Sequence, residues 1–220
     1  MLAAVLFDVD FTLAKPGPDL GPEGYRRLGA RFGLELDPAL YEEARIEAVR
    51  DLERHPELDH DEEIWIAFTT RIVEHMGGRG AEARRCAVEM VRAWEHSHNF
   101  ELYDDVLPVL DELRRHRLRI GLVSNTARDL THFVEHHGLD VDAVVSSGRF
   151  GKTKPHPSIF RYVLERLDVP PGVTAMVGDS VEDDIEGAAA IGMRGYLIDR
   201  EGRHPEGLPD LWALPAALGL

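Results

Sequence analysis

Cysteine is nearly absent from the sequence, because Cys86 is the single cysteine among 220 residues. One thiol cannot form an intramolecular disulfide, and we therefore expect a reducing, cytoplasmic location. Cys86 lies within an amphipathic helical pattern. Its expected role is that of a small buried side chain rather than of a nucleophile.

Long hydrophobic runs are missing as well. No apolar stretch approaches the length of a transmembrane helix, and no charged region precedes a signal-like segment at the N-terminus. Hydrophobic residues make up 44% of the chain and charged residues 30%, which is typical of a soluble globular protein. We expect no membrane partner, and 220 residues allow either one large domain or a core with an insertion.

Basic residues are outnumbered: 25 Lys and Arg stand against 40 Asp and Glu, for a formal net charge of −15. This balance argues against a nucleic-acid partner, since phosphate backbones attract basic surfaces. It provides no long-range attraction for an anionic substrate either. A phosphate ester would have to be held by local positive charge. The sequence does not indicate the oligomeric state.

Two acids directly follow the first hydrophobic run. Residues 2–13 read LAAVLFDVDFTL, which places Asp8 and Asp10 after a short apolar segment that predicts a buried strand. Side chains alternate along a strand, so both acids would point the same way if the strand reaches that far. Buried acids are costly unless a cation or a reaction needs them, and ligands bind at this end of parallel strands. An ordinary strand ending in polar turn residues is the alternative.

Three later segments predict polar groups for the same edge of a sheet. LRIGLVSN (118–125) predicts a strand that ends in Ser124 and Asn125, whose hydroxyl and amide suit anion oxygens. GKTKPHPSIF (151–160) places Lys154 in a loop that opens a helix, and TAMVGDSVEDDIEGAAAIG (174–192) predicts a strand that ends at Asp179 before an acidic turn and an alanine-rich helix. Taken singly, these groups also suit helix caps, a solvated lysine and a helix N-terminus. Their joint occurrence favours one functional site.

Residues 22–98 contain little strand signal and predict three or four helices, each with one apolar stripe. Such stripes must be buried together, which indicates a small helical bundle. After it the chain returns to alternating helix and strand. The expected helices span residues 22–32, then carry Leu40, Ala44, Ala48 and Leu52 after the N-cap Asp37, next Ile64, Phe68, Ile72 and Met76, and last Ala83, Ala87, Met90, Val91 and Trp94.

Four motifs occur in a fixed order: D-x-D-x-T at residues 8–12, a hydrophobic strand ending in Ser124, K-P-x-P at residues 154–157, and G-D-x-x-x-D-D-I at residues 178–185. In this order they resemble the haloacid dehalogenase-like (HAD) hydrolase superfamily. The motifs directly cover about a quarter of the chain, and their order and spacing organise all of it.

The departures from the family pattern are small. Phe11 stands where the family most often has Gly, which makes the turn after the second acid bulkier. Lys152 and Lys154 compete for one role, and Lys154 fits because it precedes the proline. Asp184 looks like the family acid that steadies the metal, and Asp183 is a second candidate.

The resemblance implies an α/β fold. Its Rossmann-like three-layer core, with a mostly parallel sheet, would comprise residues 1–15 and 101–220, and a helical-bundle cap would be inserted as residues 16–100. Caps of this subfamily close over the site and shape the substrate pocket. The expected hinges are Ala14–Gly21 and His98–Tyr103.

The resemblance also implies the chemistry of a phosphatase. Asp8 would be the nucleophile that forms an aspartyl-phosphate, and Asp10 would act as acid and then as base. Thr12 would help to orient Asp10. Ser124 and Asn125, together with Lys154, would bind the phosphoryl oxygens and complete the substrate-binding set.

Crowded carboxylates and a phosphate dianion require a cation, and oxygen ligands suit Mg²⁺. The implied ligands are the carboxylates of Asp8 and Asp179 and the main-chain carbonyl of Asp10, with Asp184 in support. The expected function is therefore Mg²⁺-dependent hydrolysis of a small phosphorylated metabolite.

Three other functions remain open at this stage. A haloacid dehalogenase would not need an acid at position 10 or Mg²⁺. A phosphomutase would need a cap that holds a bisphosphate intermediate. A non-catalytic binding protein on the same scaffold is the third, because fold does not fix function. The sequence does not identify the natural substrate.

Overall fold

The computed structural model describes residues 2–52 and 54–220 of the chain. The chain divides into two compact units, Met1–Lys15 with Glu101–Leu220, and Pro16–Phe100. Within the described part of the chain, no helix is both long and apolar enough to cross a bilayer.

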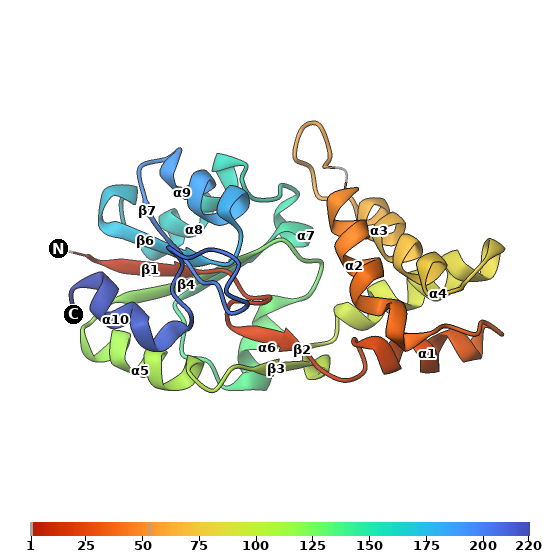
Figure 1. The fold of residues 1–220 in the computed structure, drawn as a ribbon. Coiled ribbons are helices and arrows are strands. Elements are labelled where there is room, and N and C mark those ends of the chain that lie inside the picture. Colours follow the sequence, from red (N-terminus) through yellow and green to blue (C-terminus); the bar gives the residue numbers. More distant parts are fainter. Residues whose placement is uncertain (1, 53) are drawn as a thin grey trace. The chain divides into compact units, whose positions relative to one another are not determined.

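The first unit is built on a five-stranded sheet with strand order β5-β4-β1-β6-β7 (Figure 1). Every pairing in this sheet is parallel. The carboxyl ends of β4, β1 and β6 therefore meet at one edge, with β1 in the middle. The strands are β1 (Ala4–Phe7), β4 (Arg119–Ser124), β5 (Ala143–Ser146), β6 (Thr174–Gly178) and β7 (Arg194–Leu197).

The three central strands are the ones that the sequence predicts. β1 and β6 are buried along their whole length, and in β4 only Arg119 is exposed. Strands covered on both faces appear in a sequence as continuous apolar runs, which is why these segments are readable. The edge strands β5 and β7 are short and less completely buried, and the sequence did not predict them.

Helices cover both faces of the sheet and give three layers, which confirms the predicted α/β architecture. Figure 1 shows α8 and α9 on one side of the sheet and α5 and α10 on the other. The apolar side predicted for α8, including Phe160 and Leu164, is buried in the core. The elements are α5 (Val106–Arg115), α6 (Leu130–His137), α7 (Ser147–Phe150), α8 (Pro157–Leu167), the π-helical turn η4 (Val181–Glu186), α9 (Gly187–Ala189) and α10 (Leu214–Leu218).

The second unit is helical, as predicted. Asp37 caps its second helical segment, since its carboxylate accepts a hydrogen bond from the Ala39 N–H at 2.9 Å. The first turn after this cap is a 3₁₀ turn, so the α-helix begins at Tyr41 rather than at Pro38. The elements are α1 (Pro22–Arg31), η1 (Pro38–Leu40), α2 (Tyr41–Arg50), α3 (Glu62–His75) and α4 (Gly80–Trp94).

The buried face of α3 differs from the prediction. Ile72 and Met76 are buried as expected, whereas Ile64 and Phe68 are only half-buried. Because α3 packs against both α2 and α4, its contact surface is wider than one stripe. The additional buried positions are Ile66, Thr69 and Val73. Cys86 on α4 is fully buried, which confirms its expected structural role.

The chain passes between the two units through paired strands. β2 (Ala14–Pro16) and β3 (Phe100–Leu102) form a separate two-stranded sheet. β2 falls within the segment Ala14–Gly21 and β3 within His98–Tyr103, the segments that the sequence analysis expects to act as hinges.

Candidate active site

Three carboxylates gather at the carboxyl edge of the sheet. Asp8 follows the last residue of β1 and Asp179 follows the last residue of β6. The Asp8 N–H donates to the Val177 carbonyl at 2.9 Å, which continues the β1–β6 pairing up to the acid. Asp184 comes from the turn η4 and is fully buried. Each of the three acids offers one oxygen within 4.8 Å of the others, and we call this group the acid cluster.

Lys154 supplies the positive charge inside the acid cluster. Its ammonium donates to Asp8 Oδ1 at 2.5 Å and to Asp184 Oδ1 at 2.6 Å. The Lys154 side chain is only 3% exposed, so these contacts are shielded from water. The structure thus places the Lys154 ammonium against Asp8 and Asp184.

Asn125 holds the loop that carries Lys154. Its Oδ1 accepts from the Lys154 N–H at 2.7 Å, and its Nδ2 donates to the Lys154 carbonyl at 3.1 Å and to Asp183 Oδ2 at 3.4 Å. The sequence analysis expects Asn125 to bind phosphoryl oxygens. In the structure its amide contacts the protein and fixes the loop that carries Lys154, and its role toward a phosphoryl group stays a prediction. Asp183 takes part in this clamp, while Asp184 belongs to the acid cluster.

Burial and like charge dominate the electrostatics of the cluster. Burial, reinforced by Asp8 and Asp184, raises the pKa of Asp179 to about 8. Burial also raises the pKa of Asp184 to about 7, although Lys154 opposes this shift. Burial alone would lower the pKa of Lys154, but Asp184 and Asp8 together raise it above its ordinary value. Three carboxylates therefore share one ammonium, and two negative charges stay uncompensated when all are ionised.

This charge deficit and the donor set fit a divalent cation. Two like charges about 4 Å apart repel by about 4 kcal/mol at an effective dielectric near 20. The available donors are carboxylate oxygens, which suit Mg²⁺ better than softer metals. Asp8, Asp179 and Asp184 are the residues that could hold the ion. No other group of three or more His, Cys, Asp or Glu side chains in the described residues meets the same spacing.

The close approach of Asp184 depends on Gly178, the last residue of β6. A Cβ atom on Gly178 would lie 2.1 Å from Asp184 Oδ2, closer than any side chain allows. The Ser180 N–H donates to the same oxygen at 3.1 Å. The glycine of the fourth motif is therefore needed so that η4 can bring Asp184 against the strand end.

Asp10 lies beyond β1, which ends before Asp8, so the strand does not extend as far as the expected shared orientation of the two acids requires. The Asp10 carboxylate accepts a hydrogen bond from Arg128 Nη2 at 2.5 Å. Burial raises the pKa of Asp10, while Arg128 opposes the rise. Thr12 is fully buried, and among the residues that the structure describes its hydroxyl has no hydrogen-bond partner. The expected orienting bond from Thr12 to Asp10 is thus absent, and the Arg128 guanidinium occupies that role.

A second arginine that the sequence analysis missed fixes the loop after Asp10. Arg200 Nη2 donates to the Thr12 carbonyl at 2.8 Å and to Asp105 Oδ1 at 3.0 Å, and Nη1 donates to Asp105 Oδ2 at 2.9 Å. The guanidinium carbon lies 3.7 Å from the centre of the Tyr103 ring. Neither Arg128 nor Arg200 stands in a local pattern, so no sequence signal marks them.

Ser124 ends β4 next to β1 and is 2% exposed. It lies at the edge where the sequence analysis expects it. Phe11 adopts a left-handed backbone conformation with φ of 63°, a region that favours glycine. The family's usual glycine at this position therefore matches the backbone that the turn requires.

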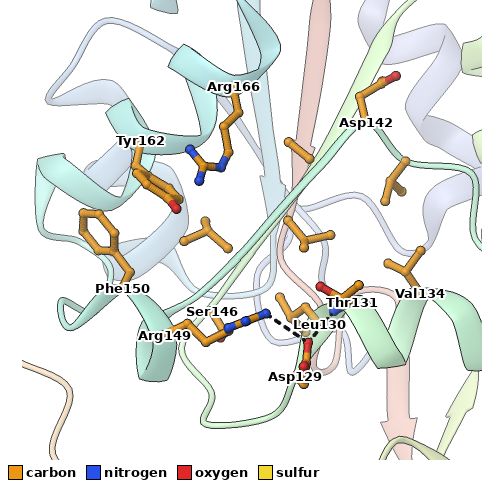
Figure 2. A pocket seen from close by; sticks show the side chains of 14 residues that line it. Asp129, Leu130, Thr131, Val134, Asp142, Ser146, Arg149, Phe150, Tyr162 and Arg166 are labelled. Carbon is orange, nitrogen blue, oxygen red and sulfur yellow. Dashed lines mark hydrogen bonds and ion pairs between the residues drawn. The ribbon is translucent and has the colours of Figure 1, made fainter.

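A cavity of about 670 Å³ lies along the edge strand β5. Figure 2 shows Asp129 bonded to Arg149 and Thr131 on one wall, with Tyr162 and Arg166 on another. None of the three acids of the cluster lines this cavity. The candidate catalytic centre is therefore defined by its charged groups and not by this cavity.

Comparison with known proteins is consistent with this geometry. Residues 2–192 match the haloacid dehalogenase-like hydrolase family. The chain is 31% identical over 225 residues to the glyceraldehyde 3-phosphate phosphatase of Methanopyrus kandleri, a match that covers 96% of the chain and 92% of that protein. It is 38% identical over 122 residues to a phosphatase of Mycobacterium tuberculosis. That match covers 53% of the chain and 55% of the relative, so the chain spans about half the length of this protein.

Solved structures share the fold over the whole chain. A HAD-hydrolase from Bacillus subtilis bound to magnesium superposes with a TM-score of 0.73 at 20% identity, covering 100% of this chain and 99% of that one. The protein therefore belongs to the haloacid dehalogenase-like hydrolase family. Its relatives include a phosphatase and a glyceraldehyde 3-phosphate phosphatase.

Proposed function

We propose that the protein is a Mg²⁺-dependent phosphatase that hydrolyses a small phosphorylated metabolite through an aspartyl-phosphate on Asp8. One observation carries this proposal: the Asp8 carboxylate lies buried between the Lys154 ammonium and two further acids. A carboxylate in that position has an adjacent cation and a donor set for a metal. Asp10 follows two residues later, as an acid–base residue for the same reaction would.

The proposed reaction has two steps. In the first, an Asp8 oxygen bonds to phosphorus while the ester P–O bond breaks, and Asp10 gives a proton to the leaving alkoxide. In the second, water attacks the phosphorus of the aspartyl-phosphate, Asp10 accepts the proton, and the Asp8–phosphorus bond breaks to release inorganic phosphate. Lys154 holds Asp8 in place and balances negative charge throughout, and Ser124 donates to a phosphoryl oxygen.

When bound, Mg²⁺ would neutralise charge on the acid cluster and on the phosphoryl oxygens. Asp8 and Asp179 would hold it, together with the Asp10 carbonyl, and Asp184 would support them. The charge deficit of the cluster and the magnesium in a solved structure of the same fold support this assignment.

The substrate is expected to be a phosphate monoester of low molecular weight. The relative from Methanopyrus kandleri is a glyceraldehyde 3-phosphate phosphatase, so short sugar phosphates are the first esters to assay. Residues 16–100 and the turn at Phe11 are the regions that we expect to select among them.

Turnover of p-nitrophenyl phosphate with Mg²⁺, and its loss in EDTA, tests the proposal. Asp8→Asn should be inactive, and isotopically labelled phosphate should appear on Asp8 in the wild type. Asp168→Asn is the matched control, because Asp168 is exposed in a left-handed conformation that Asn also accepts. Label on a different residue would contradict the mechanism.

The Asp10→Asn variant separates the two steps. p-Nitrophenolate is a good leaving group and needs little protonation, so formation of the aspartyl-phosphate should partly survive. Hydrolysis of the aspartyl-phosphate should slow by roughly 10²–10⁴, which predicts a burst of about one equivalent of p-nitrophenolate. Halide release from a 2-haloacid, or a requirement for a bisphosphate, would instead favour a dehalogenase or a phosphomutase.

A further inference from the structure

Arg128 has a charged, buried side chain and is not a member of the acid cluster. Its side chain is 0% exposed, although it carries a full positive charge. Burial of a guanidinium is expensive unless it is paired. The carboxylate that it pairs with is Asp10, whose side chain is 19% exposed. The buried Arg128 guanidinium therefore pairs with Asp10, the acid of the first motif that is not part of the acid cluster.

The loop after β4 presents Arg128 in a fixed position. The Arg128 N–H donates to Thr126 Oγ1 at 3.2 Å, and the Thr126 carbonyl accepts from the Gly148 N–H at 3.0 Å. A Cβ atom on Gly148 would lie 2.8 Å from the Ala127 Cα, so α7 packs tightly against this loop. The guanidinium carbon also lies 5.2 Å from the centre of the Phe133 ring. The arginine is thus held by its loop and by the Phe133 ring as well as by its hydrogen bond to Asp10.

Asp10 depends on Arg128 alone. Within residues 2–52 and 54–220, Arg128 Nη2 is the only group that hydrogen bonds to the Asp10 carboxylate, and it engages Oδ1. Oδ2 has no such bond in that part of the chain. A hydrogen bond to one oxygen restricts rotation of the carboxylate about its Cβ–Cγ bond. The second oxygen is then available to another partner.

We infer that Arg128 is a positioning residue, which fixes the Asp10 carboxylate by Oδ1 so that Oδ2 serves the leaving group and then the attacking water. This inference rests on the proposed function and adds a residue to it. Each of the two acids of the first motif then has its own buried cation, Lys154 for Asp8 and Arg128 for Asp10. Arg128 does not touch the substrate in this scheme and acts only through Asp10.

The dependence of the rate on the leaving group tests this role. An alkyl phosphate needs a proton on its leaving oxygen, whereas p-nitrophenyl phosphate does not. Arg128→Gln should lower the single-turnover rate of aspartyl-phosphate formation from the alkyl ester by about tenfold or more, a part of the effect of general acid catalysis, and leave KM nearly unchanged. The rate of the p-nitrophenolate burst should change by less than about threefold. Arg128→Lys keeps the charge without the planar fork and should show a smaller but equally selective loss.

The Asp10→Asn background provides the internal control. If Arg128 acts through Asp10, adding Arg128→Gln to Asp10→Asn should cause no further loss of kcat. Arg85→Gln is the matched surface variant, because Arg85 forms an exposed ion pair with Glu82 at 2.9 Å, and it should behave as wild type. Thermal unfolding of each variant separates loss of folded protein from loss of rate, and Arg128→Lys serves if Arg128→Gln does not fold.

Two results would overturn the inference. The first is an equal loss of the single-turnover rate of aspartyl-phosphate formation from both esters in the Arg128 variants, which indicates a purely structural role. The second is a full additional loss in the Asp10→Asn background. Wild-type inactivity toward both esters would overturn the proposed function as well, so the two failures are distinguishable.

Discussion

Replacing Lys154 by Met removes the single cation that the acid cluster contains. The ammonium lies 2.5 Å from Asp8 Oδ1 and 2.6 Å from Asp184 Oδ1, with almost no access to water. Met has a similar length and no charge, so the change acts mainly on electrostatics. We expect Lys154→Met to unfold more easily than wild type in EDTA and to regain much of the difference in Mg²⁺.

The magnitude follows from the cost of an unpaired buried charge. Breaking a buried ion pair by removing one partner destabilises a protein by about 3–5 kcal/mol. For a chain of this length, 1 kcal/mol corresponds to about 2–4 °C in Tm, which predicts a loss of about 6–20 °C. The matched control is Lys15→Met, whose exposed pair with Glu101 spans 3.7 Å. A surface pair of this kind contributes about 0–1 kcal/mol, so the Tm of Lys15→Met should be close to that of wild type.

The stability deficit of Lys154→Met should depend on pH in one direction. Burial raises the pKa of Asp179 to about 8 and that of Asp184 to about 7 in wild type, and loss of the ammonium should raise both further. A carboxyl group with a raised folded pKa lowers the stability of the protein as the pH rises from its unfolded pKa of about 4 up to the folded value. The deficit of Lys154→Met should therefore be greatest at about pH 9 and shrink towards about pH 6.

Differential scanning calorimetry of both variants, in EDTA and in Mg²⁺ across this pH range, measures the effect. Equal Tm values for wild type and Lys154→Met at high pH without metal would refute the reasoning. So would a Tm deficit that grows as the pH falls.

Three other predictions use the same site and its surroundings. Asp179→Asn should weaken Mg²⁺ binding in a calorimetric titration, whereas the exposed Glu89→Gln should not, and equal affinities would remove Asp179 from the ligands. Gly178→Ala should displace Asp184, since its Cβ atom would fall 2.1 Å from Oδ2, and should lower both Mg²⁺ affinity and turnover while Gly172→Ala, where no atom lies within 4 Å, changes neither. Burial raises the pKa of Cys86 to about 11, so iodoacetamide at about pH 8.5 should alkylate it only as fast as the protein opens, and fast labelling of the folded protein would contradict its burial.

Two acids of the acid cluster, Asp8 and Asp179, could be predicted because each directly follows an apolar strand. β1 and β6 are buried on both faces, so the sequence marks where they end, and Asp8 and Asp179 occupy the next position. Parallel pairing then brings these ends together. The position of Lys154 could be predicted for a similar reason, since it lies in the loop just before α8, which begins at Pro157.

The partner of Asp10 could not be predicted in the same way. Arg128 lies 118 residues from Asp10 in a loop without regular structure, and arginines are common throughout the chain. Its burial results from the packing of α7 and α6 around the loop, which no periodic pattern encodes. The family resemblance implies Thr12 as the residue that orients Asp10, but among the described residues the Thr12 hydroxyl has no hydrogen-bond partner.

The pairing of β2 with β3 keeps the two points where the chain leaves and re-enters the first unit next to each other. β2 and β3 are neighbours in one small sheet, and adjacent strands are about 4.8 Å apart. The chain thus leaves the first unit and returns to it almost at the same point. A short linker is therefore long enough to join these two positions, and the residues of the acid cluster all lie outside the segment that it would replace.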